Sequence, residues 1–81
     1  MHFYDALKFI LTMHAGAKVA RKEWNKFNEF DHHERRFICK GYENGKYRIH
    51  YKYIATDYEK EQLYIPSQED MIADDWYIME N

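Results

Sequence analysis

Two short segments near the ends of the chain hold the side chains best suited to binding a polar ligand. The first, residues 16–25, contains Arg21, Trp24 and Asn25. An arginine guanidinium can hold a phosphate through two parallel hydrogen bonds, and an indole can stack on a nucleobase. The sequence therefore predicts a ligand contact in this segment. The structural alternative places Trp24 in the core and leaves Arg21 as a surface charge.

The second segment, residues 66–76, combines a helix start with further polar groups. Ser67 stands three residues before Asp70, a spacing that resembles a capping box and predicts a short helix through Ala73. The hydroxyl and amides at such a helix start also suit an anion or a ribose. Three side chains of this segment could hold a polar ligand: Ser67, Asp70 and Asp74. Trp76, by contrast, is assigned to the core.

The histidine-rich stretch suggests a metal site, although a solvated loop is the favoured interpretation. Adjacent His32 and His33 would point in different directions on a strand or a helix. The motif His32-His33-Glu34 would need further ligands from elsewhere, with His14 and His50 as the candidates. The prediction is that the chain binds no metal.

Covalent catalysis has little support in the sequence. Cys39 lies opposite His50 if the central hairpin forms as expected, and a neighbouring imidazole can turn a thiol into a thiolate. Packing is the favoured role for a lone cysteine. No glycine-rich phosphate loop, carboxylate pair or serine triad is evident, so we predict no catalytic residue and no cofactor.

Length and composition indicate one small domain over residues 1–81. The fifteen aromatic side chains exceed the needs of so small a core and favour a homo-oligomer. Residues 1–56 carry a net charge of +5 and residues 57–81 a net charge of −7, so the chain is not a bulk nucleic-acid binder. No apolar run is long enough to span a membrane, and the single cysteine fits a reducing cytoplasm.

The N-terminal third predicts a helix, a short strand and a loop. Apolar residues recur at helical spacing over residues 3–14, and Gly16 is expected to end this helix in a left-handed conformation. Residues 19–21 are expected to form a short strand. Residues 26–34 are polar and irregular, and are predicted to be a loop.

The central third predicts a hairpin around Asn44-Gly45, because this dipeptide favours a type I′ turn. The turn fixes the pairing of the two strands. The predicted partners are Glu43 with Lys46, Tyr42 with Tyr47, Lys40 with Ile49, Ile38 with Tyr51, and Arg36 with Tyr53. Side-chain alternation then gives an apolar face that packs on the helix: Ile38, Tyr42, Tyr47, Ile49, Tyr51 and Tyr53. The opposite face is predicted to be polar and basic, and to meet solvent, a partner subunit or an anion: Phe37, Cys39, Arg48, His50 and Lys52.

The remaining residues complete an α+β fold. Residues 56–61 are predicted to be turn-like, residues 63–65 a strand ended by Pro66, and residues 76–79 a closing strand. The expected architecture is an N-terminal helix, an antiparallel sheet of four to five strands, and a short helix near the C-terminus.

The two end segments together resemble the Thoeris anti-defence protein 2 family of phages and prophages. The N-terminal resemblance rests on Ala6-Leu7, Gly16, Val19, Arg21, Trp24 and Asn25. The C-terminal resemblance rests on Ser67, Gln68, Asp70, Met71, Ala73, Asp75 and Trp76, preceded by Tyr53-Ile54. Two positions depart from the family pattern: Lys26 replaces a glycine and Tyr64 replaces a tryptophan. Residues 26–47 align with nothing in either signature.

The resemblance implies a sequestering protein rather than an enzyme. Such a protein would be a dimer or tetramer with pockets at subunit contacts, acting in the cytoplasm of the infected bacterial host. Its ligand would be a nucleotide immune signal: a cyclised ADP-ribose made by a bacterial TIR-domain enzyme, or in some relatives a cyclic oligonucleotide. The implied roles are phosphate binding for Arg21, stacking for Trp24, and ribose contacts for Asn25, Ser67 or Asp75. A further ligand contact is expected from Gln68. Two alternatives stay open: a metal-dependent hydrolase of the signal, and an inhibitor that docks on a host protein through its aromatic and acidic surface.

Overall fold

The described part of the chain combines one antiparallel sheet with three short helices. The computed structural model describes residues 1–13, 16–25 and 34–79. In chain order the elements are α1 (Phe3–Thr12), β1 (Lys18–Arg21), α2 (Lys22–Asn25), β2 (Arg35–Glu43), β3 (Lys46–Ala55), β4 (Tyr58–Leu63), α3 (Gln68–Ile72) and β5 (Trp76–Ile78). The five strands form one sheet in the order β4-β3-β2-β1-β5, with every neighbouring pair antiparallel. The predicted α+β class is confirmed.

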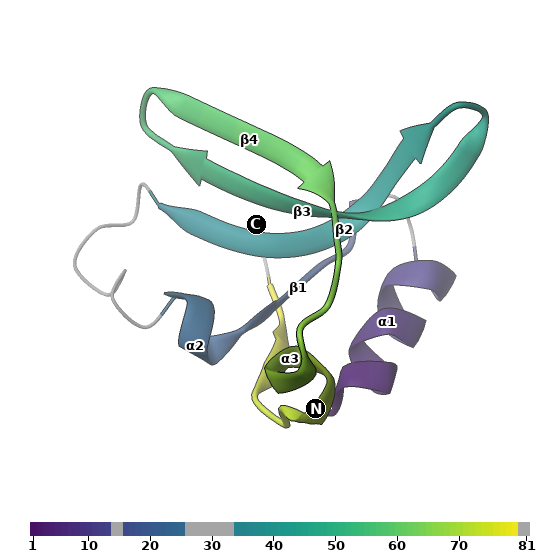
Figure 1. The fold of residues 1–81 in the computed structure, drawn as a ribbon, viewed down its shortest axis with the longest axis vertical. Helices are drawn as coiled ribbons and strands as arrows, with labels where there is room; N and C mark the ends of the chain where they lie inside the picture. The colour runs from purple at the N-terminus through teal and green to yellow at the C-terminus, as the bar shows by residue number, and fades with distance from the viewer. Residues whose placement is uncertain (14–15, 26–33, 80–81) are drawn as a thin grey trace.

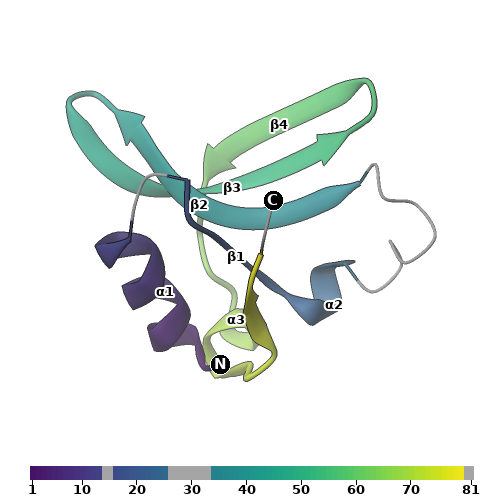
Figure 2. The ribbon, with the colours of Figure 1, turned by 180° about the vertical axis from the view of Figure 1, so that it is seen from behind.

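All three helices lie on the same side of the sheet, as two opposite views show (Figures 1 and 2). The β2–β3 hairpin extends past α1 on one side, and the β3–β4 hairpin extends on the other (Figure 1). The connection from β4 to α3 descends from the sheet, with α1 on one side and α2 on the other (Figure 1). α2 was not predicted, because its four residues are too few to show a helical period.

α1 forms where the helical period was predicted and buries Phe3, Ala6 and Ile10. The predicted left-handed cap at Gly16 is wrong. The helix ends at Thr12, and Met13 is already extended at φ −96° and ψ 178°. The N–H of Met13 still donates to the carbonyl of Phe9 at 3.0 Å, so a helix-type hydrogen bond closes this end without a glycine.

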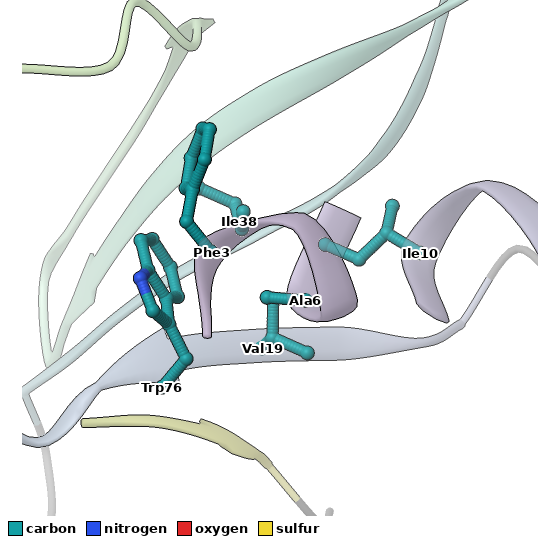
Figure 3. Packing of buried hydrophobic residues seen from close by; sticks show 6 residues of the cluster. All are labelled: Phe3, Ala6, Ile10, Val19, Ile38 and Trp76. Carbon is teal, nitrogen blue, oxygen red and sulfur yellow. The ribbon is translucent and has the colours of Figure 1, made fainter. Parts of the chain in front are cut away.

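The main core joins α1 to the sheet (Figure 3). Its buried members are Phe3, Ala6, Ile10, Val19, Ile38 and Trp76. Trp76 is only 2% exposed, which confirms its assignment to the core. Its indole N–H donates to the carbonyl of Asp70 at 3.1 Å, so the buried donor is satisfied and α3 is tied to the core.

The central hairpin agrees with the prediction in detail. Asn44 and Gly45 have φ values of 51° and 79°, as a type I′ turn requires. All five predicted strand pairs are present, from Glu43 with Lys46 to Arg36 with Tyr53. On the helix-facing side Ile38 is buried, and Ile49 and Tyr51 pack against the core. Tyr42 and Tyr47 lie beyond the helix and are exposed, which corrects the prediction that they pack on it.

The prediction for the opposite face of the hairpin is also only partly right. Phe37, Cys39 and His50 are buried within the single chain. A second cluster explains the first two: Ala20, Phe37 and Cys39, with Ile54, Tyr77 and Met79 packed against them. Two polar side chains of this face, His50 and Lys52, lie next to carboxylates of β2 and β4.

The strand after the hairpin begins earlier than predicted. Only Thr56 and Asp57 form the turn, and β4 runs over Tyr58–Leu63 rather than residues 63–65. The composition of β4 does not predict a strand, since five of its six residues are polar or aromatic and all six are exposed. An edge strand tolerates such a composition because only one of its sides is paired.

Candidate functional site

A pocket of about 400 Å³ lies on the helix-bearing side of the sheet. Residues of α2, of the connection from β4 to α3, and of β3 are among those that line it. Its lining residues are Arg21, Glu23, Trp24, Tyr51, Gln62, Leu63, Tyr64, Ile65, Ser67, Glu69 and Asp70. Volumes of this size are typical of small-molecule sites.

Three aromatic rings form the wall of this pocket. Trp24 meets Tyr51 edge to face, with ring centroids 5.4 Å apart and an interplanar angle of 85°. It also contacts Tyr64 at 6.3 Å and 72°. Behind the wall, Trp24 packs on the core ring of Trp76 at 5.1 Å. The wall is therefore anchored to the core, and its rings have little freedom to rearrange.

The polar side of the pocket is organised around Arg21. Its Nε donates to Asp75 Oδ1 at 2.9 Å, and one terminal nitrogen donates to Asp70 Oδ1 at 3.1 Å. Its side chain is only 13% exposed. The second oxygen of Asp75 accepts from the backbone N–H of Glu23 at 3.2 Å, and the Asp75 carbonyl accepts from Lys22 N–H. This network joins the end of β1 to the segment after α3.

Asp70 is the second organising residue, and it is 7% exposed. Its other oxygen, Oδ2, accepts from the Tyr64 hydroxyl at 2.9 Å and from the backbone N–H of Ser67 at 3.3 Å. The backbone N–H of Asp70 donates in turn to Ser67 Oγ at 3.1 Å. These two reciprocal bonds are the capping box that the sequence predicted. The start of α3 is thus closed by its own side chains.

The network shifts the pKa values of Arg21, Asp75 and Tyr64. Burial opposes the charge on Arg21, but the hydrogen bonds to Asp75 and Asp70 outweigh it and raise the pKa of Arg21. Burial also disfavours the Asp75 carboxylate, yet the Arg21 hydrogen bond and the Glu23 N–H lower the pKa of Asp75. Burial and the Asp70 carboxylate raise the pKa of Tyr64, so its hydroxyl stays a donor.

Asn25 occupies a structural position at the end of α2. Its side-chain amide pairs with the backbone of Arg36 in both directions, with Nδ2 donating to the carbonyl at 2.9 Å and Oδ1 accepting from the N–H at 3.0 Å. Nδ2 also lies 3.3 Å from the Tyr77 hydroxyl. Asn25 therefore joins α2 to the first residues of β2.

The structure brings only part of the predicted site into the pocket. Arg21, Trp24 and Ser67 line it, whereas Asn25, Gln68 and Asp75 are not among its lining residues. Asp75 stands directly behind Arg21, and Gln68 is the exposed first residue of α3. Whether these six residues contact a ligand stays a prediction.

The sequence analysis missed several residues that line the pocket. Tyr51 had been placed correctly on the helix-facing side of the hairpin, but it was counted as core. Tyr64 was noted only as a departure from the family pattern, although its hydroxyl bonds to Asp70. Glu23 and Glu69 gave no signal beyond their closeness to Trp24 and Ser67 in the sequence.

A second, wider hollow of about 820 Å³ lies beside the β2–β3 hairpin. It is lined by Leu11, Glu43, Asn44, Lys46, Tyr47, Arg48, Ile49, Leu63 and Tyr64. None of the six predicted site residues lies in it, so it is the less suitable candidate.

The predicted metal ligands fall mostly outside the described part of the chain. His14, His32 and His33 lie outside the described residues, as does the predicted loop of residues 26–34 except for Glu34. Among residues 1–13, 16–25 and 34–79, no group of three or more His, Cys, Asp or Glu side chains is placed to hold a metal ion. His50 does lie directly opposite Cys39, as predicted.

Comparison with known families identifies the chain. Residues 1–79 match the Thoeris anti-defense 2-like domain, also called Tad2-like. The chain belongs to this family. The match spans residues 26–47, which neither end signature covers, and it points to a role against the Thoeris defence. No curated protein and no solved structure matches the chain. In the described residues of this Tad2-like protein, no helix is long and apolar enough to cross a membrane.

Proposed function

We propose that this Tad2-like protein is a sponge that binds and sequesters a nucleotide immune signal. The expected ligand is a cyclised ADP-ribose or a cyclic oligonucleotide, and its removal would leave the host defence effector inactive. The observation that carries the proposal is the pocket with three anchored rings, Trp24, Tyr51 and Tyr64. Rings of this kind give stacking surfaces for a base at low cost in conformational entropy.

Sequestration asks less of a site than catalysis does. An enzyme must bind the transition state more tightly than the substrate, whereas a sponge needs only affinity for the ligand itself. The hydrogen-bonded frame of Arg21, Asp70 and Asp75 suits that task, because it fixes the pocket before the ligand arrives. We therefore assign no catalytic residue to the pocket.

The proposed contacts differ in kind. Trp24 and Ser67 are proposed to touch the ligand directly, and Gln68 to reach it from the start of α3. Asn25 and Asp75 fix α2 and Arg21 in place. Contacts of Arg21, Asn25 and Asp75 with the ligand are also proposed. We further propose that the protein assembles as a dimer or tetramer and acts in the cytoplasm of the infected bacterium.

The test is capture followed by release. Purified protein is mixed with glycocyclic ADP-ribose, free ligand is removed, the protein is denatured by heat, and the released compound is identified by mass. Intact ligand at a fixed ratio to protein would support the sponge. Trp24→Ala should reduce the amount of captured ligand. Tyr58→Ala, which removes an exposed ring from the β3–β4 hairpin, should not reduce it.

Two other outcomes would contradict the proposal. A chemically altered ligand whose appearance is abolished by a chelator would favour the metal-dependent hydrolase. Failure to capture glycocyclic ADP-ribose and a panel of cyclic oligonucleotides, together with a stable complex with a host protein, would favour the docking inhibitor.

A further inference from the structure

We infer that Arg36 of β2 is a positioning residue that holds two rings of the pocket wall, Trp24 and Tyr51, in place. Arg36 is not among the residues that line the pocket. It acts on the ligand only through the side chains that it holds. This inference rests on the proposed function, since it concerns the rings that are proposed to stack on the ligand.

The first argument is that α2 cannot hold Trp24 by itself. α2 is a single turn of four residues, Lys22–Asn25. So short a helix has little stability of its own, because its backbone groups find few partners within it. The orientation of Trp24 therefore depends on contacts between α2 and the rest of the fold. At the start of α2, the backbone N–H groups of Lys22 and Glu23 donate to Asp75 at 3.1 and 3.2 Å.

The second argument is that Arg36 supplies contacts at the other end of α2. Its Nη1 donates to the carbonyl of Trp24 at 3.4 Å, a contact that arginines commonly make with the last carbonyls of a helix. The backbone N–H and carbonyl of Arg36 both bond to the side-chain amide of Asn25, at 3.0 and 2.9 Å. Three hydrogen bonds to one residue thus fix the end of α2 that carries Trp24.

The third argument is that the same side chain interacts with a second ring of the wall, Tyr51. Burial raises the pKa of Tyr51, and the positive charge and hydrogen bond of Arg36 oppose that rise. Trp24 and Tyr51 meet edge to face, with ring centroids 5.4 Å apart. Arg36 therefore interacts with both members of this pair, and its removal would loosen the two rings together.

Arg36 is itself held in a defined orientation by the β2–β3 hairpin. It pairs with Tyr53 in the register that the Asn44-Gly45 turn sets. Its guanidinium carbon lies 4.7 Å from the centroid of the Tyr53 ring, within the range of a cation–π contact. The hairpin is thus the rigid support from which Arg36 positions α2 and Trp24.

The first part of the test needs no ligand, because the two indoles of the chain report on different places. Trp24 lines the pocket, whereas Trp76 is buried in the core with its N–H bonded to Asp70. In Arg36→Met, NMR relaxation should show the order parameter of the Trp24 indole N–H falling from about 0.85 toward about 0.6, the values of rigid and flexible groups. The order parameter of Trp76 should stay unchanged. Equal losses at both indoles would mean that the whole fold has loosened, and would overturn the specific role.

The second part measures the affinity for glycocyclic ADP-ribose. Arg36→Met should weaken binding about tenfold, the lower end of the effect of a hydrogen bond from a charged group. Arg36→Lys keeps the charge but lacks the planar guanidinium, and should recover part of that loss. Arg35→Met is the matched control, because Arg35 is exposed and alternation along β2 places it on the opposite face of the sheet. It should change neither the affinity nor the order parameter of Trp24.

The two parts together separate this inference from the proposed function. An unchanged order parameter for Trp24 and an unchanged affinity in Arg36→Met would overturn the inference and leave the sponge standing. If instead the wild type captures no cyclic nucleotide while Trp24 alone loses order in Arg36→Met, the sponge is refuted and Arg36 keeps its role in holding the ring.

Discussion

At the residue scale, Asp70 connects the fold to the pocket. One carboxylate oxygen accepts from Arg21, and the other accepts from the Tyr64 hydroxyl and the Ser67 N–H. Its carbonyl accepts from the indole of Trp76. The sequence predicted the capping box from spacing alone, because that contact is local. It could not predict the contacts to Arg21 and Tyr64, which depend on how distant segments pack.

The first prediction is that Asp70→Asn destabilises the protein by about 3 kcal/mol, the lower end of the cost of breaking a buried ion pair. The variant removes the charge that faces Arg21 and directs an amide N–H at donors. Urea unfolding measures the change in the free energy of unfolding. Asp74→Asn, an exposed neighbour, is the control and should change it by less than about 0.5 kcal/mol. Equal effects in the two variants would mean that Asp70 does not hold the site together.

The second prediction concerns acid. Since the folded state lowers the pKa of Asp75 below its ordinary value of 3.8, its carboxylate contributes stability above about pH 3.8. That contribution is lost as the pH falls through the lower folded pKa, because the folded state must then take up a proton. Urea midpoints between pH 7 and pH 3 should fall less steeply in Asp75→Asn than in the wild type. The same slope in both proteins would contradict this role for the Arg21–Asp75 pair.

At the element scale, the hairpin and β4 show what a sequence can and cannot predict. The Asn44-Gly45 turn fixes the register of β2 and β3 through local backbone geometry, so the pairing was predicted correctly. β4 has no such signal, since its side chains are exposed and its pairing is decided by β3. Lys52 of β3 forms ion pairs with two carboxylates of β4, those of Glu59 and Glu61.

The third prediction tests how tightly side chains pack on the face of the hairpin opposite the helices. A Cβ at Gly41 would lie 2.7 Å from the ring of His50, which sits between Glu43 and Glu61. Gly41→Ala should therefore cost about 1–3 kcal/mol, as overpacking does. The matched experiment is the same substitution in a His50→Ala background, where the cost should largely disappear. A cost that persists without the His50 ring would trace it to the strand backbone instead.

At the scale of the whole molecule, the pocket exists only because distant parts of the chain meet. α2 supplies Trp24, the hairpin supplies Tyr51, and the segment before α3 supplies Tyr64 and Ser67. The two end signatures named the first and last of these groups. The sequence could not assign Tyr51 to the pocket, because a tyrosine on the apolar side of a hairpin gives the same pattern whether it packs in a core or lines a pocket.

The last prediction is that the β2–β3 hairpin forms the contact between copies of the chain. This hairpin extends past α1 (Figure 1). It exposes the paired rings of Tyr42 and Tyr47, whose centroids are 5.2 Å apart. Exposed paired tyrosines are typical of subunit contacts. Light scattering should give a mass that is a multiple of 10.0 kDa for the wild type. The double variant Tyr42→Ser, Tyr47→Ser should lower that mass while circular dichroism stays unchanged. Tyr58→Ser, which removes an exposed tyrosine from β4, should leave the mass as it is. An unchanged mass in the double variant would place the contact elsewhere on the surface, and a wild-type mass of 10.0 kDa would show that the single chain is the working unit.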